Sequence, residues 1–186
     1  MKFTKMHGCG NDYVYVNLFE EKLDDPARVS IYVSDRHFGI GSDGLITIGP
    51  SDKADFRMRI YNADGSEAEM CGNGIRCVAK YVYDHKLTDK TEISVETGAG
   101  IKYLTLYVEE NKVSQVRVDM GEPILTPGDI PVVKADGSAY GDDYRVIDEP
   151  ISAGNREWHM TCVSMGNPHA VVFVDDVAGF ELEKYG

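Results

Sequence analysis

The chain has 186 residues and a formal net charge of −12 at pH 7, with 31 acidic and 19 basic side chains. This length allows one domain or the start of a second, and the scattered basic residues argue against a nucleic-acid-binding surface. Because no apolar run reaches the length of a membrane span and the first residues lack the apolar region of a signal peptide, we expect an acidic protein of the cytoplasm without a membrane partner.

Short apolar runs predict that the first part of the chain is rich in β-strands. Residues 3–6 and 13–16 are typical of two strands around a glycine turn, and residues 45–48 of a third. Residues 56–61 alternate with a period of two, which indicates a strand with one buried face. This last strand leads directly into Asn62 and a glycine-rich segment.

A helix is predicted between the second and third strands. Asp25 and Pro26 are a typical N-cap and first helical residue, and the glycines at 39–41 interrupt the chain after the helix. Its predicted apolar face consists of Val29, Tyr32 and Val33.

A second helix is predicted after Cys71. One buried face at helical spacing consists of Ile75, Val78, Ala79, Val82 and Tyr83. Cys71 therefore precedes the first turn, where unpaired N–H groups and the positive end of the helix dipole stabilise an anion. A thiol in this place is favoured as a thiolate, and the same amides suit a substrate carboxylate. The pattern alone leaves two interpretations open, namely a reactive thiol or a cysteine in an ordinary turn.

The remaining cysteines predict neither a disulfide framework nor a metal site. Cys77 falls inside the helix and is expected to be a packing residue, and Cys162 lies in an ordinary strand pattern. The chain has four cysteines, without a C-x₂-C pair or a following histidine pair, so we expect no bound zinc and no other metal.

Beyond the second helix the pattern returns to strands. Residues 93–95 predict a short strand, and residues 102–108 and 113–120 predict a hairpin.

A change of amino-acid composition then indicates a domain boundary. Residues 121–144 are rich in proline and glycine, which is typical of a connecting stretch. Two further strands are predicted at 157–164 and 170–174. We therefore expect a first α/β half at 1–120, and at 121–186 the connecting stretch with the beginning of a second half.

Four motifs in chain order resemble those of diaminopimelate epimerases. They are Met-His-Gly-Cys-Gly-Asn-Asp at 6–12, Tyr-Asn-Ala-Asp-Gly-Ser-Glu at 61–67, Met-Cys-Gly-Asn-Gly-Ile-Arg-Cys at 70–77 and Met-Gly-Asn-Pro-His at 165–169. They span nearly all of the chain. Asn73, after Cys71 and Gly72, fits this family better than the related proline racemases, which usually have histidine there.

The resemblance implies a fold and a reaction. The fold is α+β, with two similar β-rich halves, each wrapped around a central helix, of which this chain contains one complete half and the start of the second. The implied reaction interconverts LL- and meso-diaminopimelate, precursors of lysine and peptidoglycan, without a cofactor. Two cysteines act on opposite faces of the α-carbon. The implied partners are this small-molecule substrate and a second copy in a homodimer.

The resemblance also implies roles for individual residues. Cys71 corresponds to the first acid/base cysteine, and His169 to a histidine that assists the site. The implied substrate-binding residues are Asn11, Asn62, Gly72, Asn73 and Asn167. The asparagines have a structural alternative, because Asn is strongly selected for turns and Asn167 precedes a proline. Their occurrence together with Cys71 in the family's order favours the functional interpretation.

Two departures from the family pattern limit what the resemblance implies. Gly44 follows Asp43 where some members have a substrate-binding glutamine, so no role is transferred there. The Cys-Gly-Ser or Cys-Gly-Thr motif of the second base and the Glu-Arg substrate segment are both missing from these 186 residues. We therefore expect a fragment that lacks two-base turnover by itself. The alternatives are another cofactor-independent racemase or isomerase, or a non-catalytic binding module of the same fold.

Overall fold

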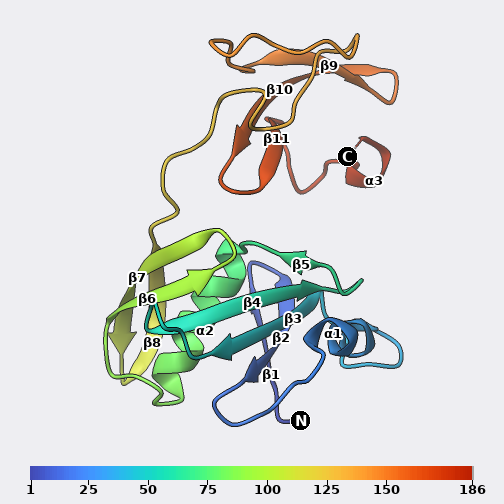
Figure 1. Ribbon diagram of the computed structural model, residues 1–186. Coiled ribbons are helices and arrows are strands. Elements are labelled where there is room, and N and C mark those ends of the chain that lie inside the picture. Colours follow the sequence, from blue (N-terminus) through green and yellow to red (C-terminus); the bar gives the residue numbers. More distant parts are fainter. Residues whose placement is uncertain (186) are drawn as a thin grey trace. The chain divides into compact units, whose positions relative to one another are not determined.

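The computed structural model describes residues 1–185 as a mixed α+β protein (Figure 1). It divides into two compact units, one covering Met1–Met120 and the other beginning at Gly121. Among residues 1–185, no helix has both the length and the apolar character that a membrane crossing requires.

One eight-stranded sheet dominates the first unit. Its strands are β1 (Thr4–Gly8), β2 (Asn11–Asn17), β3 (Gly44–Gly49), β4 (Phe56–Asn62), β5 (Glu67–Ala68), β6 (Glu92–Thr97), β7 (Gly100–Glu109) and β8 (Lys112–Val118). The spatial order is β1-β2-β3-β4-β6-β7-β8, with β5 paired to β4. The pairs β2–β3 and β4–β6 are parallel, and each is joined by a connection containing a helix, as parallel pairing requires.

The sheet curls around the helix α2 (Gly72–Asp84), which contacts both β1 and β8, the two ends of the strand order. The predicted apolar face is confirmed, because Ile75, Val78, Ala79 and Val82 are completely buried and Tyr83, partly buried, packs against the same core. They belong to one core cluster with β-strand residues such as Tyr15. The second helix therefore forms the centre of the first unit, and Cys71 lies at its N-terminal end.

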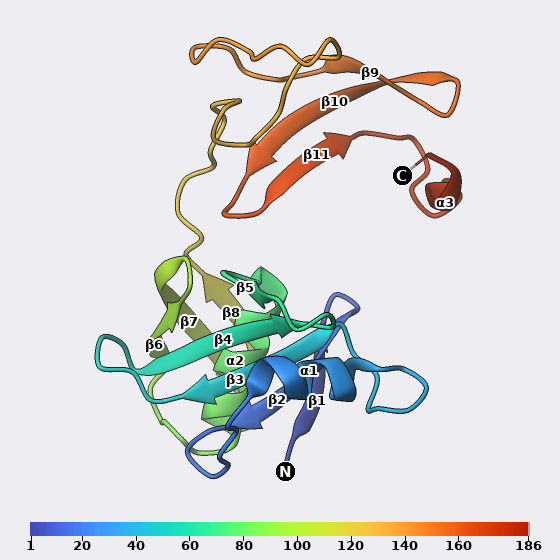
Figure 2. The same cartoon turned by 45° about the vertical axis from the view of Figure 1, so that its right-hand side comes forward.

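The helix α1 (Pro26–Ser34) lies on the other face of the sheet, opposite α2 (Figure 2). Its predicted start is confirmed, since the side chain of Asp25 accepts a hydrogen bond from the Arg28 N–H at 3.1 Å. The predicted apolar face was partly wrong, because Tyr32 is 64% exposed. Ser30 is buried instead, and its single hydroxyl proton is shared between the Tyr61 and Asn62 carbonyls at the end of β4. The side of the helix that bears Ser30 therefore faces the sheet, and Tyr32 points away from it.

A second, three-stranded sheet forms the second unit, in the order β11-β10-β9. Its elements are β9 (Glu149–Ala153), β10 (Arg156–Ser164), β11 (Pro168–Val172) and the short helix α3 (Leu182–Tyr185). β11 begins two residues earlier than the sequence predicts, because Ser164 pairs with Pro168 directly across the turn. β9 was not predicted. It contains Pro150, which an edge strand tolerates.

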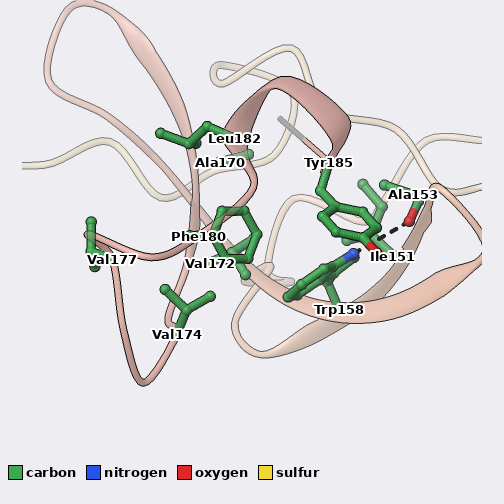
Figure 3. A pocket seen from close by; sticks show the side chains of 10 residues that line it. All are labelled: Ile151, Ala153, Trp158, Ala170, Val172, Val174, Val177, Phe180, Leu182 and Tyr185. Carbon is green, nitrogen blue, oxygen red and sulfur yellow. Dashed lines mark hydrogen bonds between the residues drawn. The ribbon is translucent and has the colours of Figure 1, made fainter.

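An apolar groove lies on the second unit (Figure 3). Trp158 is one of its lining residues. Its ring centroid is 5.2 Å from that of Phe180 and 5.3 Å from that of Tyr185, and its indole N–H donates to the Ala153 carbonyl at 3.4 Å. The other lining residues are Ile151, Ala170, Val172, Val174, Val177 and Leu182. The groove is lined mainly by hydrocarbon side chains and offers no carboxylate, imidazole or thiol for acid/base chemistry.

Candidate active site

Cys71 is the N-cap residue of α2. Its backbone is extended, with φ −141° and ψ 108°, and its Sγ accepts a hydrogen bond from the Gly74 N–H at 3.3 Å. The sulfur thus takes the place of the side-chain oxygen that usually satisfies an unpaired N–H at a helix start. The predicted position of Cys71 before the first turn is confirmed, and its partly buried thiol is in contact with the positive end of the helix dipole.

Two residues at the start of β2 lie against this thiol. The Cys71 Sγ donates to the Asn11 Oδ1 at 3.3 Å. The Tyr13 phenol interacts with both Asn11 and Cys71. Burial, and after it the charge that Cys71 can acquire, raise the pKa of Tyr13 to about 12. Tyr13 is therefore a neutral hydroxyl beside the sulfur throughout the physiological pH range.

Strand register brings Asn62 to the same edge of the sheet. Gly44, the first residue of β3, pairs with Tyr13 on one side and with Asn62 on the other. The Asn62 side chain donates to the Ser66 Oγ at 3.0 Å and so holds the turn after β4. Asn62 therefore has a structural role in this turn, and it lies level with Tyr13 across the sheet.

The first turn of α2 is held against β1 and against the turn that follows β1. The Arg76 guanidinium donates to the Gly72 carbonyl at 3.1 Å and to the Asn73 Oδ1, and its weaker contact with the exposed Cys9 Sγ is 3.7 Å long. At Gly8, a Cβ atom would lie 3.0 Å from the Asn73 carbonyl oxygen, closer than real Cβ contacts normally allow. The backbone of β1 can approach the helix start because residue 8 is glycine.

The other cysteines have different surroundings. Cys77 is 7% exposed and packs in the core of the first unit, which confirms the prediction of a packing residue. Cys162 is 4% exposed in β10. Burial raises the pKa of both thiols, and thus disfavours their thiolate forms. Cys71 is therefore better placed than Cys77 or Cys162 to exchange a proton.

Asn167 and His169 belong to the second unit. Asn167 lies in the turn between β10 and β11, where its carbonyl accepts from the Met165 N–H at 3.3 Å. His169 is exposed on β11 and pairs with Val163. The structure thus brings Asn11 into contact with Cys71 and places Gly72 and Asn73 directly after it, whereas Asn167 and His169 form part of a separate hairpin.

Sequence reasoning missed an ion cluster beside Asn11. The Arg36 guanidinium contacts the carboxylates of Asp12 at 2.8 Å and Asp43 at 2.9 Å, and the Lys5 ammonium is 3.0 Å from Asp12. Hydrogen bonding from Arg36 holds the pKa of Asp12 well below its usual range. These residues come from three separate segments, so only the strand register shows that they meet. Among residues 1–185, no group of three or more acidic, histidine or cysteine side chains is arranged to bind a metal.

Comparison with known proteins shows similarity over the whole chain. A family model described as diaminopimelate epimerase matches residues 3–126. Diaminopimelate epimerases from Methanococcus maripaludis strain C5 and from Acetivibrio thermocellus are 59% and 58% identical over 186 residues. The chain is covered completely and spans 65% and 64% of the length of these two relatives.

Solved structures share the fold at low sequence identity. A hydroxyproline epimerase from Agrobacterium vitis superposes with a TM-score of 0.62 at 14% identity, covering 91% of this chain and 50% of that one. A Bacillus anthracis protein of the PhzF family, described as a phenazine biosynthesis protein, also superposes with a TM-score of 0.62. The two sequences are 19% identical, and the superposition covers 92% of this chain and 56% of the Bacillus anthracis chain. At this identity, the likeness supports the fold alone.

Proposed function

Because this chain belongs to the diaminopimelate epimerase family, we propose that the protein interconverts LL- and meso-diaminopimelate, a step toward lysine and peptidoglycan. The observation that supports this most directly is Cys71, held as the N-cap of α2 with a hydrogen-bond donor and an acceptor both on its sulfur. The relatives that bear the name of this activity are longer than this chain, which spans about 65% of their length.

The proposed chemistry is a proton transfer at the α-carbon. As a thiolate, Cys71 takes the α-proton onto its sulfur, and the electron pair left on carbon is delocalised into the substrate carboxylate. In the reverse direction the Cys71 thiol gives its proton to the same face. Inversion requires a second acid on the opposite face, which supplies a proton to the carbon when Cys71 has removed one. The mechanism uses no cofactor and no metal.

Backbone amides at the start of α2 are suited to the substrate carboxylate. The N–H groups of Gly72 and Asn73 belong to the first turn, where intrahelical acceptors are lacking. Donors aimed at developing negative charge lower the barrier to removing a weakly acidic proton. A Cβ built on Gly72 would meet only Met120, at 3.8 Å, so this side of the turn is open to a ligand.

Side-chain amides complete the proposed substrate site. We assign substrate binding to Asn11, Asn62 and Asn73 in the first unit. In the second unit, the Met-Gly-Asn-Pro-His motif of the family contains Asn167, which we propose also binds substrate, and His169, which we propose assists the reaction. The amide nitrogens of Asn11 and Asn62 each donate one hydrogen bond within the protein. Each nitrogen also carries a second N–H, which can donate a hydrogen bond to a substrate oxygen.

The acid on the opposite face must be another group. Cys77 and Cys162 are buried, and each lies within a helix or strand and not at a helix start. We propose that this acid is absent from residues 1–185 and that the 186-residue chain by itself does not invert the substrate. We also propose a homodimer in the cytoplasm as the state of the complete protein.

The test is isotope exchange with the product of the complete reading frame. Incubation of LL-diaminopimelate in deuterium oxide is expected to yield meso-diaminopimelate with deuterium at the inverted α-carbon, measured by chiral chromatography and mass spectrometry. Cys71→Ser should lower turnover at least 10³-fold, because a hydroxyl is far less acidic than a thiol. Cys9→Ser changes an exposed thiol that does not cap a helix, and serves as the matched control.

Three results would contradict the proposal. Turnover retained by Cys71→Ser would remove this residue from the mechanism. Exchange on proline but not on diaminopimelate would indicate a different racemase of the same fold. Binding of diaminopimelate without exchange in the complete protein would indicate a binding module.

A further inference from the structure

Asp43 is linked to the Cys71 thiol through a single side chain, that of Asn11. The Asp43 Oδ2 accepts from the Asn11 Nδ2 at 2.8 Å and from the Asp12 N–H at 3.0 Å. The Asn11 Oδ1 in turn accepts from the Cys71 Sγ at 3.3 Å. The other Asp43 oxygen is 2.9 Å from the Arg36 guanidinium.

The chemistry of these groups determines which way the Asn11 amide points. An ionised carboxylate only accepts hydrogen bonds, whereas an amide has a donor end and an acceptor end. Asp43 therefore admits only the NH₂ end of Asn11. The acceptor end of the amide must then face the sulfur.

This orientation matters for the protonation state of Cys71. A carbonyl oxygen accepts a hydrogen bond from an S–H group but has no N–H to donate to a thiolate, whereas a reversed amide would donate a hydrogen bond to the thiolate. The amide direction imposed by Asp43 thus favours the thiol, and opposes the Gly74 N–H on the other side of the sulfur, which favours the thiolate.

We infer that Asp43 is a positioning residue of the proton transfer, which acts through Asn11 to hold a hydrogen-bond acceptor against the Cys71 sulfur and so favours its proton-donating thiol form. The inference rests on the proposed function in one respect, namely that the Cys71 proton is the one transferred. It adds to that function a residue outside direct contact with the sulfur that favours one of the two forms of the first cysteine.

Other titratable groups also lie near Cys71, and a test must separate their effects on the thiol from the effect of Asp43. From β2 the Tyr13 and Tyr15 phenols interact with it electrostatically, and from α2 the buried Cys77 does so. Asp43 is linked to it by hydrogen bonds through Asn11, and is itself paired with Arg36 in the cluster that also contains Asp12 and Lys5. Removing the Asp43 charge could therefore favour the thiolate either through the amide or through space.

A double-mutant cycle separates these two routes. The readout is the pH dependence of iodoacetamide alkylation in the 186-residue chain, which requires neither substrate nor turnover. Tryptic cleavage after Arg59 and Arg76 isolates Cys71 on its own peptide, while Cys9 is recovered on another and serves as an internal reference.

Asp43→Ala is expected to lower the midpoint of the Cys71 profile by about one pH unit, and so to raise its alkylation rate at neutral pH up to about tenfold. In an Asn11→Ala background the same substitution should produce no further shift. Asp12→Asn removes a carboxylate of the same cluster that does not contact the Asn11 amide, and should leave the Cys71 midpoint in place.

Two outcomes would overturn the inference. An unchanged midpoint in Asp43→Ala means that the amide direction does not matter. An equal shift with and without Asn11 means that the charge acts through space. If Asp43→Ala does not fold, Asp43→Ser provides the same test, because it also removes the carboxylate that accepts from the Asn11 amide but keeps a small polar side chain. Failure of the complete protein to epimerise diaminopimelate would refute the proposed function and leave these profiles unaffected.

Discussion

Replacement of Gly44 by alanine should destabilise the first unit strongly. Gly44 is buried at the start of β3, and a Cβ atom at this position would overlap the carbonyl oxygen of Tyr61 and lie 2.9 Å from the Tyr13 ring. The carbonyl cannot simply move aside, because it accepts a hydrogen bond from the Ser30 hydroxyl at 2.9 Å and lies in the ladder between β3 and β4.

The expected magnitude follows from these contacts. Overpacking of a buried site costs about 1–3 kcal/mol, and disturbing the buried hydrogen bond adds about 1 kcal/mol. We expect the free energy of unfolding to fall by about 3 kcal/mol, which at a slope of about 2 kcal/mol per molar moves the urea midpoint by about 1.5 M.

Urea unfolding followed by circular dichroism measures this change. Gly49→Ala is the matched control at the other end of the same strand, where a Cβ would meet only the Leu18 side chain at 3.4 Å. A Gly44→Ala midpoint within about 0.3 M of the unmodified chain would refute the reasoning. So would an equal loss in Gly49→Ala.

Two further predictions concern Tyr13 and the first helix. The folded pKa of Tyr13, about 12, lies above its ordinary value of 10.0, so the folded chain retains this proton longer, and the resulting stability is present below about pH 10 and lost between about pH 10 and 12. Tyr13→Phe should remove this component of alkaline destabilisation, and a difference absorbance titration that places Tyr13 ionisation near pH 10 would contradict the assignment. Asp25→Ala should lower the free energy of unfolding by about 1 kcal/mol through loss of the N-cap. An unchanged thermal midpoint would show that the Arg28 N–H finds another acceptor.

Much of the first unit was predictable from local sequence patterns. The alternation in β4 and the helical spacing after Cys71 each record which side chains face the core, and the structure confirms both. Asp25 and Pro26 mark the start of α1 for an equally local reason. Tyr32 was misassigned because apolar spacing alone does not show that Ser30 would be buried to cap carbonyls from β4.

The candidate site was predictable only in part. Cys71 and its glycines stand out because a helix start is visible in the sequence. The Asp43 contact with Asn11 was not predictable, because it joins residues 32 positions apart and depends on the parallel register of β2 and β3. The strand β9 was missed because it contains a proline, although its edge position makes proline acceptable.

Chemical damage to the Cys71 sulfur should affect the structure of the protein as well as its chemistry. The atom proposed to exchange the substrate proton also closes the first turn of the central helix, through the Gly74 N–H. Oxidation of this sulfur to a sulfinic acid, or its alkylation, changes the shape and charge of a helix cap as well as consuming a thiol. Loss of activity through such modification should therefore coincide with faster hydrogen exchange in the first turn of α2, so that the inactivated molecule is also marked by local unfolding.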